Sequence, residues 1–283
     1  MTEKEYKKIF EEYLSAVLNG LGDGLLEQAM KYVLSAGGKR IRPVLTLAVA
    51  NCLGVPSKKV LPFACSLEII HNSSLVHDDL PCIDNDDYRR GRLSCHKKFG
   101  ESAAVLCGDA LQNFAYEHSL NAIKDLSGVK CMELISRYSG FRGMLGGQFK
   151  DVYAEKNKIV NRELLEEIEI KKTAKLIMAS VLIPTFFVEK NYFSELKEYA
   201  ENVGVVFQIV DDVLDVKGDK NLLGKTLGKD SENGKLTSVE IYGLSECERL
   251  VQEKTQKAVS ALKNVENSEF LKNFAVELSK RIY

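Results

Sequence analysis

Residues 61–80 read LPFACSLEIIHNSSLVHDDL, and residues 81–92 continue as PCIDNDDYRRGR. In the first part apolar residues recur at helical spacing, and the pattern returns along most of the chain, as in YAENVGVVFQIVDDVLDV at 199–216. Alternating strand patterns are hard to find. With only five prolines in 283 residues, the uninterrupted segments are long enough for helices of about ten to twenty residues. The sequence predicts an all-α protein.

Breaks between these segments are short. Glycine, proline and small polar residues predict loops at 20–24, 35–43, 51–57, 81–97, 154–161 and 217–235. None has the length or low complexity of a linker, and no repeat recurs at a fixed period. We therefore expect residues 1–283 to form a single domain.

Charge and cysteine content narrow the possible partners. The formal net charge is −1, from 39 basic and 40 acidic residues, so no overall field favours nucleic acid or an anionic membrane. Seven cysteines without a C-x-x-C pair indicate free thiols in a reducing cytosol. The start, MTEKEYKK, lacks a signal peptide's apolar core, and the apolar run at 176–188 is too short to span a membrane. We expect a cytoplasmic protein without a membrane anchor.

The acidic run after residue 77 is interrupted by a proline. Asp78, Asp79 and Asp84 cannot share one face of an unbroken helix, because six residues turn its direction by about 240°. Pro81 lacks an amide hydrogen and disfavours helical geometry before it, so we expect the helix to end near Leu80. The chain would then loop back and let the carboxylates converge.

A second acidic motif, DDVLD at 211–215, lies within an apolar helix pattern. Asp211 and Asp215 share a face one turn apart, where like charges destabilise a helix. Either motif alone could be a solvated acidic helix end, or an N-cap run in the case of residues 84–87. Neither shows the alternation of an EF-hand loop. Their recurrence among apolar helices favours a site for Mg²⁺, which takes a few carboxylates and leaves other positions to water and phosphate.

Basic residues accompany the first acidic motif. Arg89 and Arg90 follow it directly, and SAGGKRIRP at 35–43 places three cations behind two glycines. Arginine grips phosphate oxygens in pairs, and glycine lets the backbone come close. Each cluster in isolation would be read as solvated surface charge. Beside the aspartates, they predict a cavity that binds one magnesium-bridged and one magnesium-free diphosphate.

These motifs together resemble those of bacterial short-chain trans-prenyl diphosphate synthases, the farnesyl and geranylgeranyl diphosphate synthase family. The similarity covers essentially the whole length. It is carried by GGKRIRP (37–43), LEIIHNSSLVHDDLPCIDNDDYRRG (67–91), CHKKFGESAAVLCGDALQ (95–112), GGQFKD (146–151), KKTAKLI (171–177), FQIVDDVLD (207–215) and LGKTLGKD (223–230). The resemblance implies the all-α isoprenoid synthase fold, with helices around a deep central cavity, and a homodimer.

The resemblance also implies roles for individual residues. Three magnesium ions would flank the allylic diphosphate, held on one side by Asp78, Asp79 and Asp84 and on the other by Asp211, Asp212 and Asp215. The residues that would hold this diphosphate or its developing cation are Arg89, Lys172, Thr173, Gln208 and Lys225, of which Lys172, Thr173 and Gln208 are the catalytic candidates. The isopentenyl diphosphate pocket would comprise Lys39, Arg42, His71 and Arg90.

Other positions carry weaker implications. His71 taken alone would more often be a core histidine, and its place in LEIIH argues otherwise. Gln148 and Asp151 match the family's GGQxxD and are further site candidates, whereas Cys82 and Met178 are interpreted as packing residues. The chain departs from the family at 171–174, KKTA for His-Lys-Thr-Gly, and at 235–238, KLTS for Lys-x-Thr-Tyr. These departures concern a helix kink near Thr173 and a late loop.

The implied reaction is ionisation, condensation and elimination. Magnesium would neutralise the diphosphate that leaves dimethylallyl, geranyl or farnesyl diphosphate. The double bond of isopentenyl diphosphate would attack the allylic cation, and a proton would pass to the departing diphosphate. No residue needs to act as a nucleophile, which fits four histidines without a triad or H-E-x-x-H spacing. Apolar helices would exclude water from the cation.

Two rival interpretations remain open at the sequence level. A terpene cyclase shares an aspartate-rich motif, but its second motif usually contains Asn, Ser and Glu, and its pocket tryptophans are absent here. A non-catalytic subunit of a heteromeric synthase tends to lose its acidic motifs, and both are intact here.

Product length is predicted from Ser73 and Ser74. Five residues before Asp78 lie about 7.5 Å from the metal end of the helix, where the growing tail must go. Synthases that stop at fifteen carbons often have an aromatic residue at one of these positions, so two serines favour the twenty-carbon geranylgeranyl product, with farnesyl diphosphate as the alternative. The serines could instead be polar filler, with the cavity closed by Ile69, Ile70 or Phe114.

Overall fold

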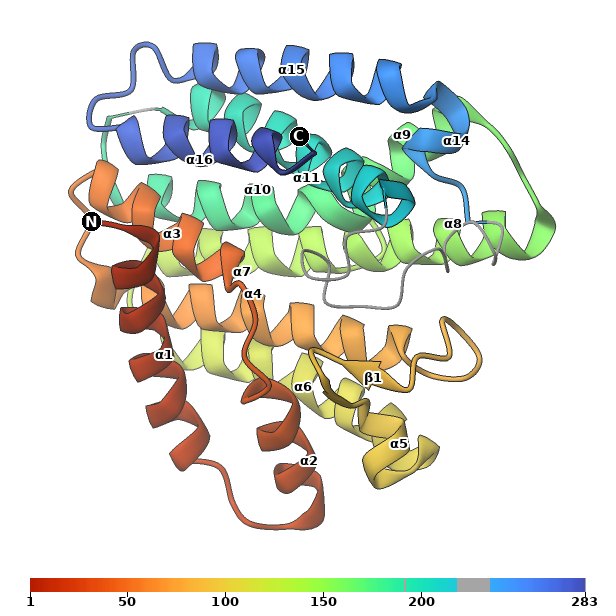
Figure 1. The fold of residues 1–283 in the computed structure, drawn as a ribbon. Coiled ribbons are helices and arrows are strands. Elements are labelled where there is room, and N and C mark those ends of the chain that lie inside the picture. Colours follow the sequence, from red (N-terminus) through yellow and green to blue (C-terminus); the bar gives the residue numbers. More distant parts are fainter. Residues whose placement is uncertain (191, 218–234, 283) are drawn as a thin grey trace.

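The computed structural model describes residues 1–190, 192–217 and 235–282, and it confirms an all-α protein (Figure 1). Its α-helices are α1 (Glu3–Asn19), α2 (Leu25–Leu34), α3 (Ile41–Cys52), α4 (Ser57–Asp78), α5 (Cys95–Phe99), α6 (Glu101–Asn121), α7 (Leu126–Ser139), α8 (Met144–Asn157), α9 (Arg162–Ile168), α10 (Lys175–Leu182), α11 (Phe193–Lys217), α14 (Ser238–Tyr242), α15 (Leu244–Ala261) and α16 (Glu269–Ser279). A π-helix, η1 (Glu169–Ala174), joins α9 to α10, and two 3-10 helices are η2 (Ile183–Phe187) and η3 (Lys280–Ile282). Within the described ranges the strands are β1 (Tyr88–Arg89) and β2 (Arg92–Leu93), which pair antiparallel.

Side-chain caps define where several helices begin. Thr2 and Glu5 form a capping box at the start of α1, each side chain accepting a hydrogen bond from the other residue's amide. Asp125 and Asn161 cap α7 and α9 by accepting amide hydrogen bonds at 3.1 and 2.8 Å. These caps satisfy amides that have no partner within the helix.

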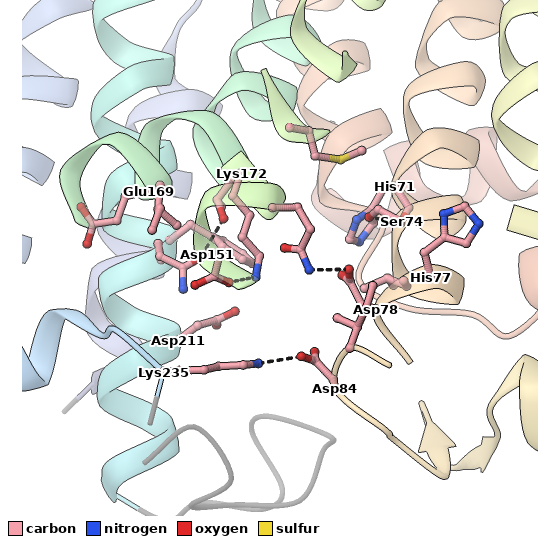
Figure 2. Close-up of a pocket in the computed structure, with 18 of the residues that line it drawn as sticks. His71, Ser74, His77, Asp78, Asp84, Asp151, Glu169, Lys172, Asp211 and Lys235 are labelled. Atoms are coloured by element: carbon pink, nitrogen blue, oxygen red, sulfur yellow. Dashed lines mark hydrogen bonds and ion pairs between the residues drawn. The ribbon is translucent and has the colours of Figure 1, made fainter. Parts of the chain in front are cut away.

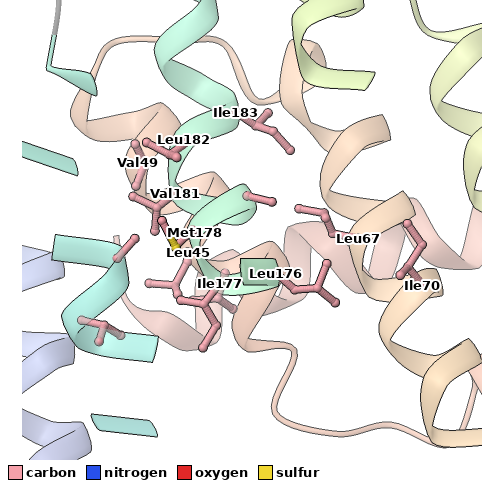
Figure 3. Packing of buried hydrophobic residues seen from close by; sticks show 14 of the residues in the cluster. Leu45, Val49, Leu67, Ile70, Leu176, Ile177, Met178, Val181, Leu182 and Ile183 are labelled. Carbon is pink, nitrogen blue, oxygen red and sulfur yellow. The ribbon is translucent and has the colours of Figure 1, made fainter. Parts of the chain in front are cut away.

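Helices α4 and α11 form the centre of the molecule (Figure 1). Helix α4 packs mainly against α3 and α6, and α11 packs mainly against α15, α10 and η1. Between them lies a tightly packed apolar core, in which Leu45 of α3, Leu67 and Ile70 of α4 and Leu176 of α10 are fully buried (Figure 3). This core holds in place the two helices that carry the acidic motifs.

The apolar run at 176–188, too short to span a membrane, is largely buried within the protein. It comprises most of α10, whose residues Leu176–Leu182 are all buried, followed by η2 with Pro184 near its start. No helix in the described part of the chain is long and apolar enough to cross a membrane.

Several predicted loops differ from the structure at their edges. Helix α3 already begins at Ile41, since Pro43 falls in the first turn, where its missing amide hydrogen costs nothing. Helix α8 continues to Asn157. The predicted loop at 81–97 contains the β1–β2 hairpin and the start of α5. Most of the loop predicted at 217–235 lies outside the described residues.

Candidate active site

A cavity of about 530 Å³ lies between the end of α4 and the helices α8, η1 and α11 (Figure 2). Residues 235–237 contribute to its wall. Side chains of both acidic motifs line it, so motifs more than a hundred residues apart in sequence face one space. The cavity therefore brings side chains of the two acidic motifs together.

The first acidic motif forms at the end of α4, as Pro81 predicts. The helix ends at Asp78, Asp79 caps it, and the amide of Asp84 donates to the carbonyl of Asp78 at 2.9 Å. Asp78 and Asp84 both line the cavity. Asp79 is only 2% exposed and is turned to Arg89, whose guanidinium donates two hydrogen bonds to its carboxylate.

The carboxyl group of Asp78 faces the cavity from the end of α4 and has a strongly shifted pKa. Burial raises its pKa to about 6; Lys172 opposes this rise, and the Asp84 carboxylate adds to it. Crowded carboxylates in a sheltered cavity disfavour their own ionised form. A divalent cation between them would relieve that repulsion.

The second acidic motif lies on the last turns of α11. Asp211 and Asp212 line the cavity, whereas Asp215, 4% exposed, is not among the lining residues. Asp212 accepts a hydrogen bond from Gln208 at 2.8 Å and further ones from Ser238. Asp211 and Asp215, one turn apart, thus have different surroundings, since Asp211 lines the cavity and Asp215 does not. The helical spacing alone did not predict this difference.

Three polar contacts cross or border the cavity between the motifs. Gln148 of α8 donates to Asp78 at 2.7 Å, and Lys235 lies 3.1 Å from a carboxylate oxygen of Asp84 (Figure 2). Lys172 forms an ion pair with Asp151. Burial would lower the pKa of Lys172, but Asp151 and Asp78 outweigh it and raise this pKa. Lys172 therefore remains a cation beside the first motif.

The π-helix η1 places Lys172 and Thr173 at the cavity wall. Such a turn inserts an extra residue into a helix and is frequent at functional sites. Thr173 donates to the side-chain oxygen of Gln208 at 2.7 Å, which links η1 to α11. Gly147 lets α8 lie against η1, because a Cβ there would come within 2.3 Å of the Lys172 amide nitrogen.

A basic pocket lies at another side of the same cavity. Lys39, Arg42 and His71 all line it. Burial lowers the pKa of Arg42 to about 10, and its buried Nε finds no hydrogen-bond partner among the described residues. Burial and the neighbouring arginines hold the pKa of His71 well below its usual value, so its ring is neutral. A guanidinium with a buried nitrogen that has no partner among the described residues, beside a neutral imidazole, suits an anionic ligand.

The structure places some predicted site residues elsewhere. Arg90 does not line the cavity; its guanidinium passes over Gly38 and donates to the Gly37 carbonyl and the Asn72 side chain. Gly38 thus makes room for an arginine rather than directly for a ligand, since a Cβ there would lie 2.7 Å from the Arg90 Cζ. Ser73 is buried and donates to the Gly108 carbonyl at 2.9 Å, while Ser74 lines the cavity.

The positions of four further residues singled out in the sequence complete the comparison. Arg89 lines the cavity beside its ion pair with Asp79. Met178 is fully buried, as a packing residue should be, but Cys82 is exposed, so its interpretation as a packing residue is wrong. Lys225 lies outside the described residues.

The carboxylates of the cavity fit magnesium by their chemistry. Asp78 at the end of α4, Asp84 in the turn after it and Asp211 of α11 offer hard oxygen ligands. Within the described ranges, no three acidic, histidine or cysteine side chains gather closely enough to form an ion site by themselves. The aspartates instead stand on facing walls, which leaves room for ligand oxygens between them.

The sequence did not single out Glu169. This acid of η1 is 4% exposed, lines the cavity, and has its pKa raised to about 7 by burial. Its position between two isoleucines, in EEIEIKK, was the available signal, because a charged residue flanked by apolar ones on a buried helix needs a partner.

Comparison with known proteins identifies the family of the chain. A family model described as polyprenyl synthetase matches residues 23–277. Farnesyl diphosphate synthase of Micrococcus luteus is 41% identical over 262 residues, covering 90% of this chain and 90% of that protein. Chloroplastic geranylgeranyl pyrophosphate synthase of Catharanthus roseus is 40% identical over 242 residues, covering 84% of this chain and 68% of that protein.

Solved structures show the same fold. The geranyltransferase of Helicobacter pylori, complexed with magnesium and isoprenyl diphosphate, matches with a TM-score of 0.84 and 30% identity, covering 99% of this chain and 97% of that chain. The geranyltranstransferase of Thermotoga maritima gives a TM-score of 0.85 and 31% identity, covering 99% and 98%. The architecture is the all-α isoprenoid synthase fold. The chain belongs to the polyprenyl synthetase family, as an enzyme of the short-chain prenyl diphosphate synthase class.

Proposed function

We propose that this chain is a single catalytic domain that joins isopentenyl diphosphate to dimethylallyl, geranyl and farnesyl diphosphates. The observation that carries the proposal is the pairing of two acidic motifs across one cavity with a basic pocket at its side. One apolar core cluster includes residues from α1 to η3, which supports one domain. The neighbour from Helicobacter pylori, solved with magnesium and isoprenyl diphosphate, supports magnesium as the cofactor.

Magnesium would supply Lewis-acid stabilisation of the leaving diphosphate. We propose Asp78, Asp84 and Asp211 as its principal ligands, because their side chains line the cavity. Asp79, Asp212 and Asp215, with three ions in all, remain predictions. Asp79 is engaged by Arg89 and Asp212 by Gln208, so we expect them to act first by holding these side chains in position.

The remaining cavity residues bind and orient the two substrates. Lys172 and Arg89 would place positive charge near the allylic diphosphate, and Thr173 and Gln208, which line the same cavity, would stabilise the developing cation. Lys39 and Arg42 would hold isopentenyl diphosphate, with neutral His71 as a hydrogen-bonding neighbour. No side chain is required as a base, since the departing diphosphate can take the proton.

We further propose geranylgeranyl diphosphate as the main product, with farnesyl diphosphate as the alternative. The small side chain of Ser74 at the cavity wall supports the longer product. We also propose a homodimer, supported by an exposed apolar stripe formed by Phe141, just before α8, and by Leu145, Phe149 and Tyr153 of α8.

The direct test is chain extension by the purified protein alone. With magnesium, isopentenyl diphosphate and each allylic diphosphate, we expect prenyl products detectable by mass spectrometry. Asp78→Ala and Asp211→Ala should each lower turnover by on the order of a hundredfold or more, because they remove charge stabilisation at the leaving group. Helical content measured by circular dichroism should not change.

A matched control is Asp23→Ala, since this exposed acid does not line the cavity and pairs only with Lys31 among the described residues. It should retain wild-type turnover. Absence of any chain extension by the wild-type protein would refute the proposed function, and near-normal turnover of either cavity variant at saturating magnesium would refute that ligand.

A further inference from the structure

A buried hydrogen-bonded cluster beside the cavity joins three segments of the chain. The hydroxyl oxygen of Ser238, at the start of α14, lies 2.7 Å from an oxygen of Glu169 in η1 and 2.8 Å from an oxygen of Asp212 in α11. The Ser238 amide also donates to Asp212, at 2.7 Å. All three residues are at most 6% exposed.

Counting protons decides how these groups interact. A serine hydroxyl has one hydrogen, so it can donate to only one of two carboxyl groups and must accept from the other. Asp212 already accepts from the amides of Ser238 and Gln208, which stabilises its ionised form. The two short distances therefore require one of the two carboxyl groups to donate a hydrogen bond to the hydroxyl while the other accepts from it, so Ser238 bridges Glu169 and Asp212.

We infer that Glu169 and Ser238 are positioning residues that orient Asp212 of the second acidic motif. The chain of hydrogen bonds runs from Glu169 through Ser238 to Asp212. It returns to η1 through Gln208 and Thr173, at 2.8 and 2.7 Å. The second motif is thereby held between the π-helix and the segment that begins at residue 235.

The same cluster sets the place of the late loop. Lys235, three residues before Ser238, pairs with Asp84 of the first motif. Ser238 stands where the resembling family often has tyrosine, so this chain reaches Asp212 with a short hydroxyl side chain. The effect on catalysis rests on the proposed function, whereas the effect on the loop does not.

Four variants separate the contributions of the cluster. Ser238→Ala removes the hydroxyl and keeps the backbone amide. Glu169→Gln keeps a neutral hydrogen-bond donor, and Glu169→Leu removes it. The double variant with Ser238→Ala and Glu169→Leu removes both ends of the bond. Ser180→Ala is the matched control, because Ser180 is also fully buried but donates only within its own helix in the described structure, to the Leu176 carbonyl at 2.9 Å.

The first readout is amide hydrogen exchange of residues 235–242 in magnesium-free protein. We expect Ser238→Ala to speed this exchange by on the order of tenfold, since a buried hydrogen bond is lost and both acids lose a partner. Glu169→Gln and Ser180→Ala should exchange like the wild type. The double variant should be no faster than Ser238→Ala alone, because the two residues act through one bond.

The second readout is steady-state kinetics. Ser238→Ala should raise the magnesium concentration for half-maximal activity by roughly fivefold to tenfold, while the KM for isopentenyl diphosphate stays within about twofold. A general loss of structure would change both. Wild-type exchange and magnesium dependence in Ser238→Ala, or damage in Glu169→Gln equal to that in Ser238→Ala, would overturn the inference. A wild-type protein without prenyl transfer would refute the proposed function, and the exchange data would still decide the role of the cluster.

Discussion

Ser73 and Ser74 are adjacent in α4, but their side chains meet different surroundings. Ser73 is 3% exposed and donates to the Gly108 carbonyl of α6, whereas Ser74 lines the cavity. A bulky side chain at 73 would enter the α4–α6 contact. One at 74 would enter the cavity itself. We therefore expect Ser74 rather than Ser73 to limit product length, and Ile69 and Ile70, both fully buried, do not line the space.

Ser74→Phe should shorten the product. The aromatic ring fills the volume that an additional isoprene unit needs, so the main product should shift from geranylgeranyl to farnesyl diphosphate. Mass spectrometry of the dephosphorylated products measures the shift. Ser73→Tyr serves as the comparison and should instead lower the unfolding temperature, because its ring meets α6. If the wild type already stops at farnesyl diphosphate and Ser74→Phe changes nothing, the floor of the cavity lies elsewhere.

The raised pKa of Asp78 predicts a pH-dependent stability. Its value is about 6 in the folded protein and 3.8 in the reference state, so the folded state binds the proton more tightly. This tighter proton binding contributes at most about 3 kcal/mol to the free energy of unfolding. The contribution is fully present below about pH 4 and is lost as the pH rises through 6. In EDTA, Asp78→Asn should gain stability over the wild type at pH 7.5 but not at pH 4.5. Denaturant unfolding measures this, and an equal difference at both pH values would contradict the predicted shift.

The sequence pattern predicts which residues lie near one another better than it predicts where a single side chain points. Spacing placed Asp78 and Asp84 together correctly, because Pro81 dictates where α4 ends. Arg90, predicted for the substrate pocket, donates to the Gly37 carbonyl, and its backbone adopts a left-handed conformation with φ of 53°. Such a conformation is rare for arginine and leaves no mark in the sequence pattern.

Among elements, the long helices were predictable and the irregular ones were not. Helices α4 and α11 follow from apolar periodicity over many residues. The π-helix η1 departs from that period by one residue within a continuous helical run, so its sequence looks like α-helix. The strands of the hairpin have two residues each, too few for an alternating pattern. The resemblance to the family predicts a kink near Thr173, and the structure shows that this kink is a π-helix.

Contact between α8 and η1 depends on Gly147. A Cβ there would lie 2.3 Å from the Lys172 amide nitrogen and 2.7 Å from its Cα, and backbone atoms cannot move aside cheaply. Gly147→Ala should therefore destabilise the protein by about 1–3 kcal/mol and displace Lys172, with a fall in turnover. Denaturant unfolding and kinetics measure both. Gly22→Ala is the control, since its Cβ would meet only the Glu27 side chain at 3.6 Å, and equal stability of the two variants would contradict this account.

At the scale of the whole molecule, a row of exposed apolar side chains runs along α8. Phe141, just before α8, and Leu145, Phe149 and Tyr153 within it recur every four residues and are 38–75% exposed. The rings of Phe149 and Tyr153 stack with centroids 6.3 Å apart. Aromatic side chains aligned on one face favour contact with another protein surface. Leu145 also lines the cavity, so a second copy of the chain packed on this stripe would cover one wall of the active site.

Phe149→Asp should therefore separate the proposed dimer into monomers. The side chain is 71% exposed in one chain, so the substitution leaves the fold intact, but it would bury a charge in the interface. We expect the wild type to sediment at twice the 31.6 kDa chain mass and the variant to dissociate on the order of a hundredfold more readily. Leu25→Asp, at a 69% exposed position in α2, should remain dimeric. A monomeric wild type, or a Phe149→Asp variant that dimerises as tightly as the wild type, would show that the stripe on α8 is not the subunit interface.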